Sequence, residues 1–228
     1  MDIAVVEADT RRKRLLIADM DSTIIGQECI DELADMVGLK DHVAAITERA
    51  MRGEIAFEPA LRERVALLTG INTATIRDVI ADRITVNPGA RALVRTMRAK
   101  GGHTALVSGG FTLFTADIAA RVGFDEHRAN ILDMDGDVVA GTVREPILGR
   151  DAKREALIEL TRSLGTTPAD AIAVGDGAND LAMLGEAGLG IAYHAKPAVA
   201  ATADIRIDHG DLTALLFVQG YAAEEFVR

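Results

Sequence analysis

Short apolar segments that end in a polar residue recur along this chain and alternate with stretches of helical periodicity. "RLLIAD" ends at Asp19, "HTALVSGG" reaches Ser108 just before two glycines, and "AIAVGD" ends at Asp176. Apolar runs this short are typical of buried strands, and strands that alternate with helices are typical of a parallel sheet covered on both faces. Ligands of such sheets bind beyond the carboxyl ends of the strands. The pattern therefore predicts an α/β fold with a Rossmann-like, doubly wound parallel sheet and a polar site along one edge.

One long block interrupts this alternation. Helical spacing covers roughly residues 30–37, 40–51, 56–69 and 73–83, and no strand pattern occurs between about 26 and 85. An all-helical block inside an alternating chain predicts an inserted subdomain. We expect residues 26–85 to form a helical cap and residues 1–25 and 86–228 to form the core. Within the core, "ANILDMDGDVVAGTV" predicts a small β-hairpin that turns near Asp135 and Gly136.

The composition excludes several classes of partner. The net charge is −10 and there is no Trp, so neither electrostatic attraction to a polyanion nor a base-stacking platform is expected. No apolar run is long enough to span a bilayer. The single cysteine, Cys29, excludes an intramolecular disulfide and fits the reducing cytoplasm. We therefore expect a small-molecule substrate, no nucleic acid and no membrane, with a monomer or a homodimer equally open.

Two acidic segments predict a metal site. Asp19 and Asp21 stand two residues apart, so in an extended segment their side chains point the same way and repel each other. In "VGDGAND" the glycines allow a tight bend around Asp176, and Asp180 stands at the start of the next helix. A hard divalent ion such as Mg²⁺ binds oxygen ligands of this kind. The alternatives are ordinary turn residues at the strand ends and, for Asp180, a helix-capping acid.

Two further features favour phosphate binding. Ser108 combines a hydroxyl group with the backbone N–H groups of Gly109 and Gly110 just ahead of a predicted helix. Lys153 lies in the first turn of its predicted helix, where a lysine opposes the helix dipole. A serine in a glycine turn and a solvent-exposed lysine are the structural alternatives. Taken with the carboxylates, the set indicates phosphoryl transfer.

In order and spacing, four segments resemble the motifs of the haloacid-dehalogenase superfamily of aspartate-nucleophile phosphatases. They are "DMDST" at 19–23, "VSGG" at 107–110, Lys153, and "GDGAND" at 175–180. Within the superfamily, "DSTIIGQECIDELA", "AMRGEIAFEPALRERV" and "VSGGF" are similar to the branch that hydrolyses O-phospho-L-serine. The resemblance implies release of L-serine and phosphate, the last step of serine biosynthesis. Two alternatives stay open: a phosphatase or phosphotransferase acting on another small phosphomonoester or on an alcohol such as homoserine, and a receiver-like phosphoaspartate switch.

The resemblance also implies roles for the core residues. Asp19 would be the nucleophile that forms an aspartyl-phosphate, and Asp21 the general acid and then the general base. The implied ligands of Mg²⁺ are Asp19, the backbone carbonyl of Asp21, and Asp176, with Asp180 orienting them. The residues implied to bind the phosphoryl group or the substrate from the core are Ser108, Gly109, Lys153 and Asn179.

In the cap, the resemblance implies that Glu28 meets the substrate ammonium and that Arg64 meets its carboxylate. Phe57 and Met51 would supply an apolar lining. The structural alternative for the two charged residues is a solvated helix surface. The residues alone do not favour Arg64 over the nearby Arg62.

Some members of the superfamily carry a regulatory domain ahead of the first motif. Here only residues 1–13 precede the first predicted strand. A serine-sensing module of that kind is therefore expected to be absent.

Overall fold

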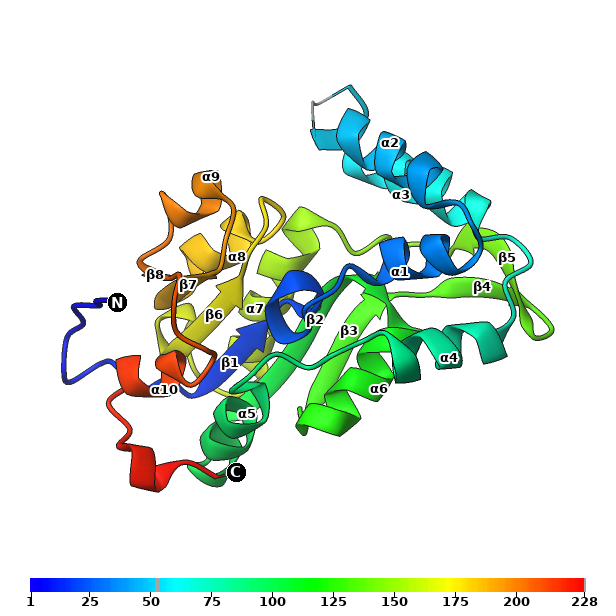
Figure 1. Cartoon of the computed structure of the whole chain (residues 1–228). Coiled ribbons are helices and arrows are strands. Elements are labelled where there is room, and N and C mark those ends of the chain that lie inside the picture. Colours follow the sequence, from blue (N-terminus) through cyan, green and yellow to red (C-terminus); the bar gives the residue numbers. More distant parts are fainter. Residues whose placement is uncertain (52–53, 228) are drawn as a thin grey trace.

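A computed structural model describes residues 1–51 and 54–227, apart from the side chain of Met51. Six strands form one sheet in the order β3-β2-β1-β6-β7-β8, and every pairing within it is parallel (Figure 1). The strands are β1 (Leu15–Ala18), β2 (His103–Phe111), β3 (Glu126–Asn130), β6 (Ala171–Gly175), β7 (Leu189–Tyr193) and β8 (Ile205–Ile207). The chain leaves β1 toward β2 on one side and returns to β6 on the other, so the winding reverses at β1. The predicted fold class is confirmed.

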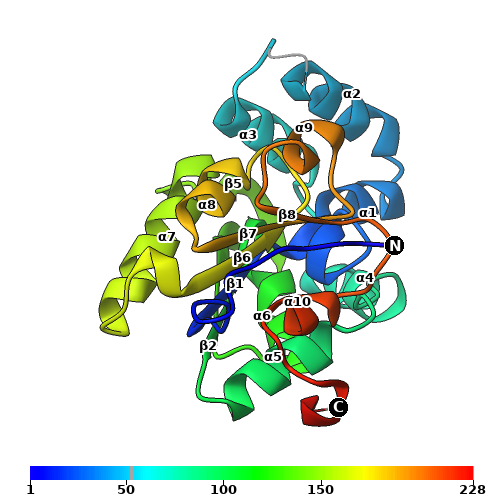
Figure 2. The same ribbon diagram turned by 90° about the vertical axis from the view of Figure 1, so that its left-hand side faces the viewer.

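Alternating side chains of the strands build two apolar layers. Leu16 and Ala18 of β1 belong to one buried cluster, and Leu15 and Ile17 to the other. Helices α5 (Ala90–Ala99), α6 (Thr112–Val122) and α10 (Ala214–Val218) pack on the first face, and α7 (Arg150–Ser163), α8 (Leu181–Glu186) and α9 (Pro197–Ala200) on the second (Figure 2). Both faces of each inner strand are covered, which explains why these strands are apolar throughout.

Among the described residues, four α-helices stand between β1 and α5 in the chain, where the cap was predicted. They are α1 (Cys29–Met36), α2 (Lys40–Met51), α3 (Phe57–Leu67) and α4 (Thr73–Asp82). The helices α2 and α3 project beyond the sheet (Figure 1), whereas α4 packs near α6. Buried side chains such as Leu33, Val65 and Val79 join the apolar cluster on the first face of the sheet. The helices α1, α3 and α4 therefore rest on the core through an apolar contact.

The β-hairpin forms where "DMDGDVV" predicts it, from β4 (Leu132–Asp135) and β5 (Val138–Val143). It is hydrogen-bonded to the connection between α3 and α4: the Gly70 N–H donates to the Val139 carbonyl (2.9 Å) and the Val139 N–H to the Ile71 carbonyl (2.8 Å). Gly141, at φ +86°, faces Thr69, and a Cβ there would lie 2.2 Å from the Thr69 hydroxyl oxygen. The hairpin and the helical insertion thus contact each other through their backbones.

Two details of the strands differ from the sequence prediction. Strand β3 was not anticipated, because an edge strand with the sequence "EHRAN" lacks the apolar signal of a buried one. Strand β2 does not break at Gly109 and Gly110 but continues to Phe111, and its register against β3 shifts after Val107. In the part of the chain that is described, no helix is long and apolar enough to cross a membrane.

Candidate active site

The first acidic segment lies at the carboxyl end of the central strand β1. The Asp19 N–H donates to the Val174 carbonyl of β6 (3.0 Å), which holds the nucleophile candidate against the neighbouring strand. The chain then turns through Met20–Ile24, where Ser22 takes the left-handed conformation (φ +54°). This turn returns the N–H of Cys29 to Asp21, whose Oδ1 accepts it at 3.1 Å. Both carboxylates are thereby fixed on the same side of the sheet edge.

Lys153 lies beneath the acidic segment and is only 1 % exposed. Its Nζ is 2.7 Å from Oδ1 of Asp19 and 2.7 Å from Oδ1 of Asp180. Burial alone would lower the pKa of Lys153, but the adjacent carboxylates of Asp180 and Asp19 raise it above its ordinary value. The ammonium therefore stays charged, which accounts for a lysine in the first turn of α7.

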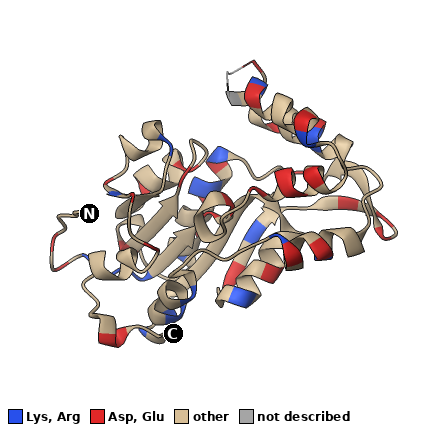
Figure 3. Ribbon diagram, in the orientation of Figure 1, with Lys and Arg blue, Asp and Glu red and all other residues tan. Residues whose placement is uncertain are grey.

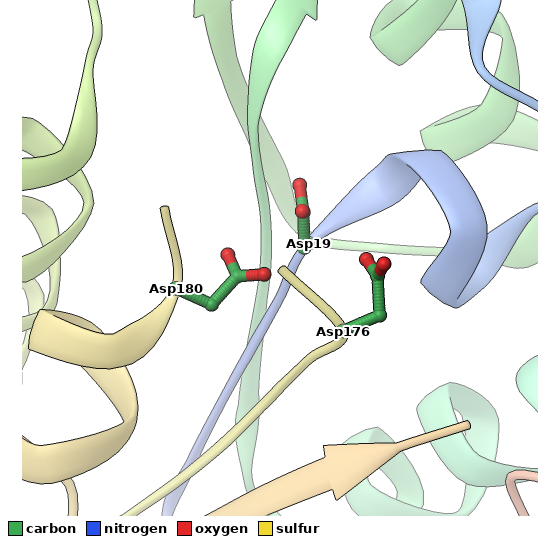
Figure 4. A group of neighbouring side chains, drawn as sticks. All are labelled: Asp19, Asp176 and Asp180. Carbon is green, nitrogen blue, oxygen red and sulfur yellow. The ribbon is translucent and has the colours of Figure 1, made fainter. Parts of the chain in front are cut away.

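Three buried carboxylates, those of Asp19, Asp176 and Asp180, form one cluster, with oxygen atoms within 4.8 Å of one another. In Figure 4 the carboxyl groups of Asp176 and Asp180 flank that of Asp19. Gly175 makes this approach possible, because a Cβ at that position would lie 2.4 Å from the carboxyl carbon of Asp180. Asp180 also accepts the Gly177 N–H at Oδ2 (3.0 Å), so both of its oxygens are engaged.

The charge of this cluster is not balanced by Lys153 alone. Burial, followed by the charge of Asp180, raises the pKa of Asp19 well above its usual range and that of Asp176 to about 6. An excess of negative charge on oxygen donors suits a hard divalent cation. The donor set therefore fits a divalent metal ion.

Asp21 faces the phosphate-binding segment predicted around Ser108. Its Oδ2 is 3.5 Å from the Ser108 hydroxyl, which in turn accepts the N–H of Gly110 at 2.9 Å. Burial, followed by the charge of Glu28, raises the pKa of Asp21 to about 7. A carboxyl group with a pKa near neutral pH is suited to both donating and accepting a proton.

These residues surround a cleft of about 450 Å³ between the carboxyl edge of the sheet and the helices α1–α3. The predicted site residues that line it are Asp19, Asp21, Glu28, Phe57, Arg64, Gly109, Asp176 and Asn179. Ser108, Lys153 and Asp180 lie beneath its floor, fully or almost fully buried. Met51 ends α2, and its side chain is outside the described residues.

Glu28 and Arg64 line the same cleft from two helices, which the sequence did not settle. Glu28 directly precedes the acidic helix α1 (Figure 3) and accepts the Ser22 hydroxyl at 2.6 Å. Burial lowers the pKa of the Arg64 guanidinium, and the nearby Asp31 and Glu28 oppose that effect. The neighbouring Arg62 points elsewhere and pairs with Glu145 at 2.6 Å. The structure thus separates two arginines that the sequence pattern leaves equivalent.

Phe57 closes the cleft above the phosphate-binding segment. A Cβ on Gly109 would lie 3.4 Å from the Phe57 ring, and so would a Cβ on Gly149. A Cβ at either position would be in van der Waals contact with the ring. The Phe57 side chain of α3 therefore lies close to both core glycines.

Lys196 and Asn130 are among the residues of the site that were not predicted. Lys196, after β7, lines the cleft with an exposed ammonium group, and its place beyond a strand end was a usable signal. Asn130 ends β3 and donates its amide group to the backbone carbonyl of Gly109 (2.8 Å). It was missed together with the strand that carries it.

The chain belongs to the haloacid dehalogenase-like hydrolase family, whose family model matches residues 16–185. The resemblance stated from the four motifs is confirmed. Among its relatives is a phosphoserine phosphatase of Polaromonas sp., 49% identical over 208 residues that cover 89% of this chain and 88% of the relative. A phosphoserine phosphatase of Mycobacterium tuberculosis is 41% identical over 99% of this chain, which spans 55% of that longer protein.

Solved structures of phosphoserine phosphatases are similar to this chain over 90% of its length. A phospho-aspartyl intermediate analogue of phosphoserine phosphatase superimposes with a TM-score of 0.83 at 38% identity, over 90% of this chain and 98% of the other. A substrate-bound phosphoserine phosphatase complex gives the same TM-score at 37% identity, with the same coverage of both chains. The similarity therefore extends over the sheet and the helical insertion together.

Proposed function

We propose that this chain is a phosphoserine phosphatase that hydrolyses O-phospho-L-serine to L-serine and phosphate. The proposal rests on one observation. A single cleft has the predicted phosphate-binding residues at its floor, and the side chains of Glu28 and Arg64 line its helical wall. An amino acid offers the complementary ammonium and carboxylate groups, and an arginine can bind the carboxylate in a bidentate pair. The names and identities of the relatives support the same substrate.

The proposed reaction begins at Asp19. Its carboxylate attacks phosphorus in line and forms an aspartyl-phosphate, while Asp21 donates its proton to the serine oxygen that leaves. Asp21, now ionised, then takes a proton from the water that attacks phosphorus, and Asp19 is regenerated. Lys153 and Ser108 offset charge on the phosphoryl oxygens. The pKa of Asp21, about 7, suits both roles at neutral pH.

The helices α1–α4 act as the cap in this proposal, over residues 26–85, and residues 1–25 and 86–228 act as the core. Residues of α1, α2 and α3 line the cleft opposite the carboxyl edge of the sheet, which supports this division. A cap that excludes bulk water would protect the aspartyl-phosphate from uncontrolled hydrolysis. Phe57, which contacts the phosphate-binding segment from α3, would form part of that cover.

Mg²⁺ is the proposed metal ion, because it favours oxygen ligands and pairs readily with phosphate. Asp19, Asp176 and the backbone carbonyl of Asp21 would hold it, and Asp180 would orient them through its contacts with Lys153 and Gly177. When bound, the ion would neutralise charge on the phosphoryl oxygens.

Metal binding should show in stability as well as in activity. We expect millimolar Mg²⁺ to raise the thermal midpoint of the wild-type protein at pH 8 and to have a much smaller effect on Asp176→Asn. The pKa of Asp176 is about 6, so the ligand is ionised above that pH and takes up a proton below it. The stabilisation by Mg²⁺ should therefore diminish as the pH falls below about 6. An equal shift in both proteins would refute the assignment of Asp176.

The sequence motifs are compatible with two other activities. Transfer of the phosphoryl group to an alcohol would use the same covalent step and differ only in the acceptor. A phosphoaspartate switch would require a long-lived acyl phosphate, and Asp21 beside Asp19 is a group suited to destroying it. The place of Asp21 beside Asp19 in one cleft thus favours turnover.

The substrate is tested with a panel of phosphate esters. L-phosphoserine, phosphothreonine, a sugar phosphate and p-nitrophenyl phosphate are compared, with and without homoserine as acceptor. We expect Glu28→Ala and Arg64→Ala each to lower kcat/KM for L-phosphoserine by about 10–100-fold, the size of a lost hydrogen bond to a charged group. Hydrolysis of p-nitrophenyl phosphate, which has neither amino nor carboxyl group, should change by less than about threefold.

Arg62→Ala is the matched control, because this arginine belongs to the same helix but pairs with Glu145 away from the cleft. It should retain wild-type selectivity. Equal losses on all esters for Glu28→Ala and Arg64→Ala would show that the two residues maintain the cap and do not read the substrate.

We further propose a small-molecule enzyme of serine biosynthesis that acts without nucleic acid, as a monomer or homodimer. The net charge of −10 supports the exclusion of polyanions. The single, buried cysteine supports a reducing compartment, the cytoplasm.

A further inference from the structure

Two consecutive glycines lie in the part of β2 that lines the cleft. Gly109 and Gly110 both line the cleft, and Gly110 donates its N–H to the Ser108 hydroxyl oxygen at 2.9 Å. A Gly-Gly peptide is free to rotate, since neither residue has a Cβ to restrict it. A flipped peptide would remove the Gly110 N–H from Ser108. A hydrogen-bond partner from another segment is therefore needed to fix the orientation of the peptide plane.

Asn130 is in a position to do so. It ends β3, lies opposite Phe111 in the sheet and is only 2 % exposed. Its Nδ2 donates to the carbonyl oxygens of Gly109 (2.8 Å) and Leu148 (3.2 Å), and its Oδ1 accepts the Leu148 N–H (2.7 Å). Two carbonyls can only accept and one N–H can only donate, so a single orientation of the amide satisfies all three.

The carbonyl of Gly109 and the N–H of Gly110 belong to the same peptide unit. In a trans peptide the two groups point in opposite directions. When Asn130 binds the carbonyl, the N–H is consequently directed to Ser108. The Ser108 oxygen then accepts the hydrogen bond of the Gly110 N–H, which leaves the Ser108 hydroxyl proton free to donate toward the cleft. In this structure the acceptor on that side is Oδ2 of Asp21, at 3.5 Å.

The same amide also reaches the segment that carries the buried ammonium. Leu148 directly precedes Gly149, whose carbonyl begins the hydrogen bonding of α7 by accepting the N–H of Lys153. One side chain thereby joins the two segments that bear the phosphate-binding groups. They are more than 40 residues apart in the chain.

We infer that Asn130 is a positioning residue of the phosphoryl site: it locks the Gly109–Gly110 peptide so that Ser108 presents its proton to a phosphoryl oxygen, and it sets that peptide in register with the start of α7. The inference rests on the proposed function only in that the site binds phosphate. Asn130 contacts neither Glu28 nor Arg64 in the described part of the chain, so binding of the amino-acid part of a substrate should not depend on it.

The test uses Asn130→Asp in the full chain with Mg²⁺. This near-isosteric change keeps an acceptor for the Leu148 N–H but sets an oxygen against two carbonyls. We expect the inhibition constant of inorganic phosphate to rise and kcat to fall, each by about tenfold or more, the size of one displaced hydrogen bond to a charged group. The inhibition constant of L-serine should stay within about twofold of the wild-type value. Asn130→Ala, which removes all three hydrogen bonds without adding charge, should weaken phosphate in the same selective way.

The control is Thr161→Val, which removes a buried hydrogen bond from the hydroxyl to the Leu157 carbonyl on α7, away from the cleft. It should lose stability but bind phosphate normally. Equal weakening of phosphate and L-serine, or unchanged phosphate binding, in the Asn130 variants would overturn the inference.

Phosphate binding can be followed by thermal shift without any turnover, which separates this inference from the proposed function. A wild-type protein that binds phosphate but not L-serine would contradict the proposed substrate. In that case the role of Asn130 is still tested by the thermal shift that phosphate causes in Asn130→Asp, compared with the shift in Thr161→Val. A shift equal to that of the wild-type protein would overturn the inference.

Discussion

Replacing Asp19 with Asn should abolish turnover while leaving the protein folded. The amide cannot attack phosphorus, and loss of a covalent nucleophile elsewhere costs about 10⁴-fold or more in kcat. The fold should tolerate the change, because the amide has the same shape and Lys153 keeps its 2.7 Å contact with Asp180. Steady-state release of phosphate from L-phosphoserine measures the effect, and circular dichroism checks the fold.

The companion variant for this experiment is Asp41→Asn, which makes the same chemical change on the exposed surface of α2. It should retain wild-type turnover. If Asp19→Asn kept more than about one-hundredth of the wild-type kcat, the covalent mechanism would be wrong, since direct attack by water would then suffice.

Replacing Lys153 with Met should have the largest combined effect on stability and activity. The ammonium is 1 % exposed and is the cation between the carboxylates of Asp19 and Asp180. Removing one partner of a buried ion pair typically costs about 3–5 kcal/mol of unfolding free energy. Loss of the cation beside the transferred phosphoryl group should also lower kcat by about 10³-fold. Urea unfolding at pH 8 and phosphate release measure the two effects.

The loss of unfolding free energy in Lys153→Met should depend on pH. Without the lysine, Asp19 loses the charge that opposes its repulsion by Asp180, so the pKa of Asp19 in the folded protein should rise further above that of the unfolded chain. Carboxyl groups whose pKa is raised by folding contribute stability when protonated and lose it as the pH rises. Lys153→Met should therefore be more destabilised at pH 8 than at pH 5. Lys40→Met, which removes an exposed lysine, is the control, and equal stability of the two variants at pH 8 would contradict the account.

The strand ends could be predicted from the sequence because the chemistry is local. A parallel sheet brings the residues after β1, β2 and β6 to one edge, so Asp19, Ser108 and Asp176 were expected together. The helices α1–α4 could be predicted as well, because helical periodicity depends only on residues that are close together in the sequence. The edge strand β3 could not be predicted, because its half-buried polar residues do not alternate with apolar ones.

Contacts between distant segments could not be read in the same way. Nothing in the spacing of Arg62 and Arg64 tells which one faces the cleft, because this depends on how α3 lies over the sheet. Lys153 was weakly suspected from its place in α7, but its contacts with Asp19 and Asp180 depend on three elements packing together. Asn130 binds backbone groups 18 and 21 residues away, and no side-chain pattern reports backbone partners.

In the proposed reaction the phosphoryl group is transferred to Asp19, and acid quenching within the first turnover can trap it there. Wild-type protein is mixed with L-phosphoserine labelled at phosphorus, quenched in acid within the first turnover, digested with pepsin and analysed by mass spectrometry. We expect a phosphoryl group on the peptide that contains residues 15–24, located at Asp19 and absent from Asp19→Asn. Rapid release of phosphate with no labelled peptide, or a label on another residue, would contradict it.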